Sequence, residues 1–141
     1  MLSFKKAIFR VLCLGLLGGG LMASQTPKEL FDLGMLSYDK QDFSKARKYF
    51  EKACDLNNGL WCSFLGDLYR SGDGVKQDSI KAAQFYSKGC ELNNSFGCGA
   101  LGMLYENGQG VEKNSIKAAQ FYSKACKLGN QKACEILKEL K

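Results

Sequence analysis

Residues 79–88, Ser-Ile-Lys-Ala-Ala-Gln-Phe-Tyr-Ser-Lys, recur unchanged as residues 115–124, a shift of 36 positions. Six cysteines follow the same shift and form three Cys-x7-Cys pairs: Cys54 with Cys62, Cys90 with Cys98, and Cys126 with Cys134. Self-similarity at a period of this length is typical of proteins built from stacked structural repeats. A looser first copy precedes these two. We therefore expect three units, at residues 27–58, 59–94 and 95–130, and a closing helix at residues 131–141.

The apolar residues of each unit have the spacing of two amphipathic helices, and no stretch alternates as a strand would. Small residues recur at fixed places in these helices, as glycine in the first helix and alanine in the second: Gly34, Gly66 and Gly102, then Ala46, Ala82 and Ala118. An internal glycine costs a helix about 1 kcal/mol. Its recurrence predicts that the backbones of the paired helices approach each other closely.

The first 23 residues have the layout of a secretory signal peptide. Lys5, Lys6 and Arg10 precede an apolar run of 13 residues, which is too short to span a membrane. We expect cleavage after Ala23 and a secreted or periplasmic protein with no membrane association afterwards. A lipid anchor on Cys13 is the alternative, but Leu12 is bulky where a small residue is expected.

Removal of this segment leaves 17 basic and 14 acidic side chains, a net charge of about +3. Acids and bases are interleaved along the chain, which is typical of solvated helix surfaces. A nucleic-acid interface would cluster its positive charge. We therefore expect no nucleic-acid partner, and we expect a monomer.

Two motif sets resemble known helical repeats. Leu33-Gly34, Ala46, Phe50 and Ala53 have the spacing of a tetratricopeptide repeat, and the pattern Tyr-x-x-Gly-x-Gly-Val, at residues 69–75 and 105–111, resembles the longer Sel-one-like repeat. With the Cys-x7-Cys pairs and the signal peptide, the chain resembles the Helicobacter cysteine-rich protein family. The resemblance implies an all-α fold, a short right-handed α-solenoid of antiparallel helix pairs stapled by disulfides.

Export places the six mature cysteines where disulfides persist. Cys54 ends the second helix of one unit, and Cys62 opens the first helix of the next unit. Both sulfur atoms therefore lie at the same end of two antiparallel neighbouring helices. The competing local scheme joins Cys62 to Cys90 and Cys98 to Cys126, and it leaves two cysteines unpaired. Parity therefore favours the Cys-x7-Cys pairs. Zinc is disfavoured, because the chain has no histidine and the spacing of seven is wider than in structural zinc sites.

The absence of histidine excludes a Ser-His-Asp triad, a Cys-His dyad and histidine-based metallohydrolase sites. Ser37-Tyr-Asp-Lys40 matches the Ser-x-x-Lys motif of serine β-lactamases, but neither Ser-Asp-Asn nor Lys-Thr-Gly accompanies it. We interpret it as a chance match at a solvated helix end. Paired glycines at residues 72/74 and 108/110 follow a helix, so we expect helix-terminating turns there and no phosphate loop. No cofactor and no catalytic residue is predicted.

If the units stack as tetratricopeptide helices do, the first helices line a groove. The side chains expected in it differ between units: Phe31, Met35, Ser63, Asp67, Arg70, Gly99, Met103, Glu106 and Asn107. Variation at these positions over a constant core suits a binding face, although surface residues also vary without function.

The family resemblance and the residues themselves point to two different functions. The family resemblance implies a β-lactamase-type hydrolase of cyclic amides, because members are described as candidate β-lactamases that bind penicillin-like compounds and so bear on antibiotic resistance. Fragments like those of peptidoglycan are the natural ligands that this implies. The alternative is a non-catalytic module whose groove holds a peptide or a protein partner. The residues favour the alternative, because no constellation in the chain accounts for attack on a lactam.

Overall fold

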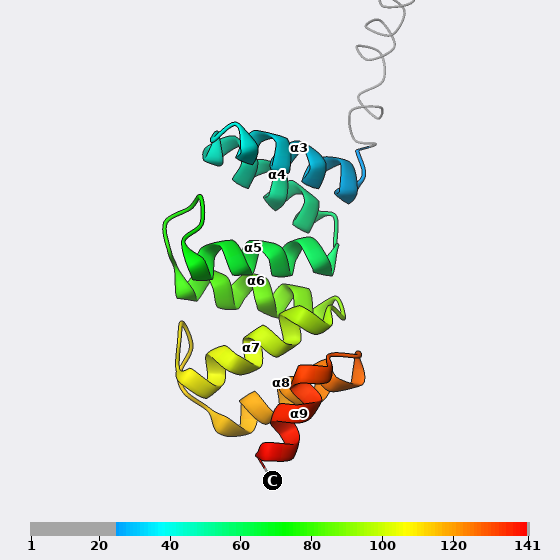
Figure 1. Ribbon diagram of the computed structural model, residues 1–141, viewed down its shortest axis with the longest axis vertical. Coiled ribbons are helices and arrows are strands. Elements are labelled where there is room, and N and C mark those ends of the chain that lie inside the picture. The colour runs from blue at the N-terminus through cyan, green and yellow to red at the C-terminus, as the bar shows by residue number, and fades with distance from the viewer. Residues whose placement is uncertain (1–24, 141) are drawn as a thin grey trace, which may run out of the picture.

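The computed structural model describes residues 25–140, which form helices joined by short loops (Figure 1). In chain order they are α3 (Pro27–Asp39), α4 (Phe43–Asp55), α5 (Gly59–Ser71), α6 (Ser79–Glu91), α7 (Ser95–Asn107), α8 (Ser115–Lys127) and α9 (Gln131–Glu139). Residues 25–140 contain no strand, which confirms the all-α class. None of their helices has the length and hydropathy of a membrane span. The predicted signal peptide, its cleavage after Ala23 and Cys13 lie outside the described residues.

Local sequence sets both ends of these helices. Thr26 caps α3 in a reciprocal capping box with Glu29, and every later helix follows an Asp or Asn whose side chain accepts a backbone N–H of the first turn. α5 and α7 end at Gly72 and Gly108, whose φ angles of +75° and +66° suit glycine. The prediction that these glycines terminate helices is confirmed.

The helices stack along one axis, from α3 at the top of Figure 1 to α9 at the bottom. Packing is most extensive within the pairs α3/α4, α5/α6 and α7/α8. We call α3, α5, α7 and α9 the first helices, and α4, α6 and α8 the second helices. α5 also contacts α7, so these two first helices lie side by side. Each unit therefore buries its apolar surface mainly against its neighbours, as in other solenoids.

Aromatic rings of the second helices fill the core, where Phe50 and Tyr86 are fully buried. The recurrent glycines of the first helices face these rings. A Cβ atom on Gly66 would lie 2.6 Å from a ring carbon of Tyr86, and one on Gly102 would lie 2.9 Å from Tyr122. The predicted close approach is therefore real, but it joins a helix backbone to an aromatic ring where we expected backbone against backbone.

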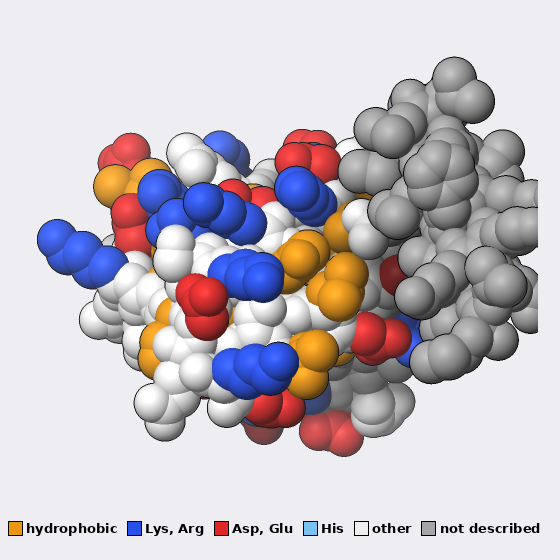
Figure 2. All heavy atoms as spheres, turned by 90° about the horizontal axis from the view of Figure 1, so that it is seen from above, with side chains coloured by type: hydrophobic (Ala, Val, Ile, Leu, Met, Phe, Trp, Pro, Cys, Tyr) orange, Lys and Arg blue, Asp and Glu red, His pale blue; other side chains and the backbone are white. Residues whose placement is uncertain are grey.

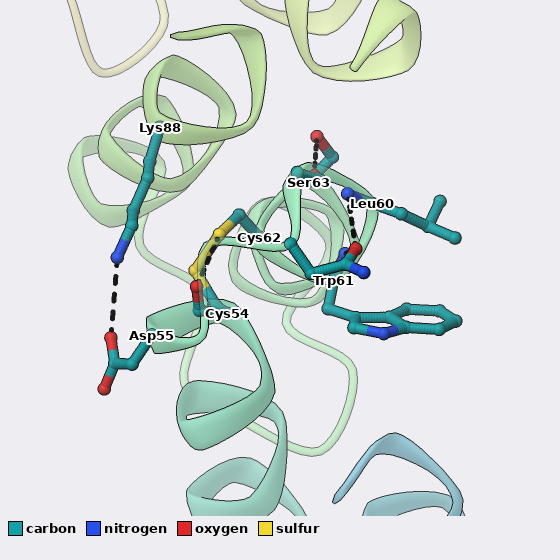
Figure 3. The surroundings of a disulfide bond; sticks show 9 residues. Cys54, Asp55, Leu60, Trp61, Cys62, Ser63 and Lys88 are labelled. Atoms are coloured by element: carbon teal, nitrogen blue, oxygen red, sulfur yellow. Dashed lines mark hydrogen bonds and ion pairs between the residues drawn. A yellow bond between two sulfur atoms is a disulfide. The ribbon is translucent and has the colours of Figure 1, made fainter. Parts of the chain in front are cut away.

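Three disulfides staple the stack. The S–S distance is 2.10 Å for Cys54–Cys62, 2.08 Å for Cys90–Cys98 and 1.96 Å for Cys126–Cys134. Each bond joins the last turn of a second helix to the first turn of the next first helix, as Figure 3 shows for the first pair. The four sulfur-bearing residues of the first two bonds are at most 2% exposed, whereas Cys126 and Cys134 are partly exposed.

Candidate binding pocket

A pocket of about 370 Å³ lies between the first helices α5, α7 and α9. One side chain from the second helix α6, Tyr86, also reaches it. The pocket has a polar end on α5, an apolar wall on α7 and a mixed wall on α9. First helices thus supply most of the residues that line this pocket.

At the polar end, Asp67, Arg70 and Tyr86 form one hydrogen-bonded network. The Arg70 Nη2 donates to Asp67 Oδ1 over 2.9 Å, and the Tyr86 hydroxyl donates to the same oxygen over 3.2 Å. Arg70 Nε lies 3.2 Å from the Tyr86 hydroxyl oxygen, which accepts its N–H. The bonds to Asp67 and Tyr86 raise the pKa of Arg70, which therefore stays charged. Burial raises the pKa of Tyr86 to about 12, so its hydroxyl stays neutral.

The apolar wall is built by α7. Phe96 is 47% exposed and packs edge-on against the Tyr86 ring, with the ring centroids 6.0 Å apart. Ala100 and Met103 follow on the same face of α7, and Gly99 leaves room beside them. A large ring that stays half exposed at the mouth of a pocket offers contact area to an apolar ligand group.

The third wall comes from the start of α9. Asn130 caps this helix through its Oδ1, which accepts the Ala133 N–H over 3.1 Å, and its Nδ2 donates to the Ser95 carbonyl over 3.4 Å. Both ends of the Asn130 amide are thus occupied. Lys132 is exposed and has no ion-pair partner among residues 25–140, and Ile136 adds an apolar contact.

The chemistry of the polar end differs in each unit. In the third unit Met103 and Glu106 occupy the register of Asp67 and Arg70, and the Tyr122 hydroxyl donates to Glu106 over 2.6 Å. Burial, and then this bond, raise the pKa of Tyr122. The first unit has Met35 and Tyr38 at the corresponding places. The charged network is therefore a feature of the second unit within the described stack.

The structure brings four of the predicted groove residues to the pocket: Asp67, Arg70, Gly99 and Met103. Glu106 and Asn107 lie further along α7, outside the pocket lining. Phe31 and Met35 pack against the core of the first unit, where Phe31 stacks on Trp61 with the ring centroids 3.8 Å apart.

The expectation that Ser63 lines the groove was wrong. Ser63 is fully buried, and its hydroxyl donates to the Gly59 carbonyl over 2.9 Å. It is wedged against Gly89 of α6 and Gly97 of α7, where a Cβ atom on either glycine would collide with it. Because those two residues lack side chains, the helices close over Ser63, and no ligand can reach it.

Sequence reasoning missed the α9 wall and two aromatic residues. Tyr86 occupies a core register of the repeat, yet its hydroxyl completes the polar network. Phe96 and Lys132 could have been found from the repeat, because both are one period apart and share the register of the exposed Leu60. Asn130 recurs as well, in the register of the N-cap residues Asn58 and Asn94, but that register indicates a helix cap and not a pocket residue.

No activated nucleophile is present at the pocket. Its lining contains no Ser, Thr or Cys, and the Tyr86 phenol is protonated. Ser37 was expected to be solvated, but it is 7% exposed and its hydroxyl donates to the Leu33 carbonyl over 3.0 Å. Residues 25–140 also hold no cluster of three His, Cys, Asp or Glu side chains placed to bind a metal ion.

Comparison with known proteins agrees with this architecture. The Sel1 repeat model matches residues 62–94 and 95–130, and the tetratricopeptide repeat model matches residues 27–60. The solved structure of Helicobacter pylori cysteine-rich protein B is 50% identical, covers 67% of this chain and 71% of its own, and superposes with a TM-score of 0.64. The chain belongs to the Helicobacter cysteine-rich protein family. Its Sel1 repeats are a feature that this chain shares with the other members.

Two further Helicobacter cysteine-rich proteins match in sequence. A Helicobacter pylori protein named "Putative beta-lactamase HcpC" is 60% identical over 75 residues, which are 52% of this chain and 26% of HcpC. "Beta-lactamase HcpA" is 54% identical over 74 residues, or 30% of its length. The chain thus matches less than a third of either relative. A Sel1 repeat protein from Oxalobacter formigenes is 25% identical over 80% of this chain and 88% of its own, with a TM-score of 0.73.

Proposed function

We propose that this protein is an exported, non-catalytic binding module that holds the anionic end of a peptide-like ligand in the pocket between α5, α7 and α9. The observation that carries the proposal is a pocket of about 370 Å³ that combines an apolar wall on α7 with Lys132 of α9, which forms no ion pair within residues 25–140. Pockets of this size that combine apolar walls with few polar groups are typical ligand sites.

The charge of the pocket selects the ligand. Asp67 neutralises Arg70 over 2.9 Å, so this pair contributes no net charge. Lys132 then leaves the pocket with one surplus positive charge. A single carboxylate next to an apolar group therefore complements both the cation and the Phe96–Met103 wall. The C-terminus of a peptide and the carboxylate of a penicillin-like compound both have this composition.

Penicillin binding is a second candidate ligand activity, favoured by the names of HcpC and HcpA. A β-lactam resembles a peptide with a free carboxylate, so it would occupy the same pocket as the peptide. Hydrolysis would in addition require a nucleophile with a base, and the pocket lining contains no Ser, Thr or Cys. We therefore infer reversible binding of β-lactam or peptidoglycan-like fragments without turnover. The three disulfides are consistent with a secreted or periplasmic location.

Binding is tested by calorimetry on the oxidised protein with three probes: a peptide with a free C-terminus, the same peptide amidated, and a penicillin. We expect the free peptide to bind more tightly than the amide. Lys132→Gln should weaken this preference by about threefold to fivefold, because a partly exposed ion pair contributes up to about 1 kcal/mol. Lys138→Gln is the matched control, since it removes the same charge from α9 outside the pocket lining.

Equal affinity for the free and amidated peptides would refute the carboxylate assignment. Turnover is tested separately with a chromogenic cephalosporin on the protein and on Arg70→Ala. We expect no hydrolysis above buffer in either case. Hydrolysis that Arg70→Ala abolishes would instead establish an enzyme with its site at this pocket.

A further inference from the structure

The two helix layers of the solenoid differ in charge. The second helices α4, α6 and α8 together carry nine basic and three acidic side chains. The first helices carry four basic and seven acidic ones. The small positive charge of the chain therefore conceals a strongly basic layer and a weakly acidic one, and the basic layer is not the one that forms the pocket.

Six lysines of the basic layer repeat with the units and form two rows. Each row has one lysine on each second helix: Lys45, Lys81 and Lys117 in the first row, and Lys52, Lys88 and Lys124 in the second. Two lysines on the same helix are separated by seven residues, or about two turns, so they share one helix face. All three lysines of the first row are exposed. Each row thus places one lysine at the same register of each second helix.

Repeated contacts hold these lysines in equivalent places. Lys81 Nζ lies 5.3 Å from the centroid of the Tyr69 ring, and Lys117 Nζ lies 5.4 Å from the Tyr105 ring. In the second row, Lys88 Nζ lies 3.5 Å from Asp55 Oδ1 of α4, a contact between neighbouring second helices that Figure 3 shows. These contacts restrict the ammonium groups of Lys81, Lys117 and Lys88, so less freedom is lost when they bind a ligand.

Little acidic charge offsets the rows. Among the ion pairs of residues 25–140, only that of Lys88 involves one of the six lysines. Seen from the α3 end, Lys and Arg side chains are interspersed with Asp and Glu side chains (Figure 2). α3 is acidic, so the surplus of positive charge comes from the second helices and not from this end of the stack.

We propose that the exposed face of α4, α6 and α8 binds an anionic polysaccharide chain that lies along the two lysine rows. A single contact between an exposed lysine and an anion is weak. A linear polymer with repeated carboxylate or sulfate groups engages lysines of all three units at once, and its affinity gains from multivalency. This surface is separate from the pocket, so the proposal does not depend on the pocket ligand.

Other polyanions suit this face less well. Nucleic-acid binding uses stacking platforms and arginine, but Tyr69 stacks on Phe85 beneath Lys81, and the one arginine of the layer, Arg47, pairs with Glu51. A bilayer would need an apolar stripe beside the lysines. The exposed Ile80 and Ile116 are each one residue from a lysine, about 100° around the helix, so they do not share its face.

The test measures binding of the oxidised protein to immobilised dextran sulfate, with uncharged dextran as the matched ligand control. We expect binding to dextran sulfate alone, with an affinity that falls as salt rises. Each row is then removed, as Lys45→Gln/Lys81→Gln/Lys117→Gln and as Lys52→Gln/Lys88→Gln/Lys124→Gln. Each triple variant should bind about tenfold more weakly. The second variant keeps the test decisive if loss of the Tyr69 and Tyr105 contacts impairs folding of the first.

The control protein is Lys40→Gln/Lys76→Gln/Lys113→Gln, which removes the same charge from exposed positions outside the second helices. It should bind dextran sulfate within about twofold of the unchanged protein, because its rows are intact. An equal loss in the control would show that net charge alone is responsible and would overturn the proposal. So would tighter binding to phosphatidylglycerol vesicles or to single-stranded DNA than to dextran sulfate.

Discussion

Replacement of Gly66 by alanine tests how the core positions the pocket. An added Cβ atom would lie 2.6 and 2.7 Å from ring carbons of Tyr86, which is fully buried. Overpacking of this kind costs about 1–3 kcal/mol. Alanine also regains the roughly 1 kcal/mol that glycine costs a helix. We expect a net loss of about 1 kcal/mol of unfolding free energy, or about 5 °C in Tm, measured by denaturant and thermal unfolding.

The ring contact can be separated from helix propensity by a double-mutant cycle. Tyr86→Leu removes the ring, so Gly66→Ala in that background should stabilise the protein by up to about 1 kcal/mol. Gly102→Ala is a graded control, because its Cβ atom would lie 2.9 Å from the nearest ring carbon of Tyr122 and should destabilise less. If Gly66→Ala raises Tm in the unchanged background, the glycine does not serve to admit the Tyr86 ring.

The disulfides and Tyr86 support three further predictions. A non-reducing peptide map should link Cys54 to Cys62, Cys90 to Cys98 and Cys126 to Cys134, and a peptide linking Cys62 to Cys90 would contradict the structure. With limiting dithiothreitol, alkylation and mass spectrometry should label Cys126 and Cys134 first, because the other four are at most 2% exposed; earlier labelling of Cys54 or Cys90 would show that exposure does not set the order. Burial raises the pKa of Tyr86 from 10 to about 12, so between these pH values the folded state holds a proton that the unfolded state loses. The stability that the neutral Tyr86 phenol contributes is therefore complete below pH 10 and is lost as the pH rises through 12. The unfolding free energy should thus fall by about 2 kcal/mol more between pH 9 and pH 12 in the unchanged protein than in Tyr86→Phe; equal falls would contradict the shift.

Much of the fold could be predicted because repeats convert one local pattern into a whole architecture. The 36-residue shift, the helical spacing and the capping residues are local signals, and they indicated the helix pairs and their order. The position of Cys54 and Cys62 at one end of neighbouring helices followed from the same reasoning. The groove was expected on the first helices only because the resemblance to tetratricopeptide repeats implies that stacking.

The prediction failed where the environment of a side chain depends on distant residues. Ser63 shares the helical face of Asp67, and its sequence position does not reveal that Gly89 and Gly97 close over it. Tyr86 occupies a core register in the repeat, yet its hydroxyl reaches the pocket because Asp67 and Arg70 of the adjacent helix accept and donate hydrogen bonds there.

The sequence by itself determined the class of fold and the helix boundaries, because these depend on periodicity and short-range hydrogen bonding. The tertiary structure alone decided which side chains share the pocket. This depends on how units with different surface residues stack, which lets Lys132 of α9 line the same pocket as the α7 wall.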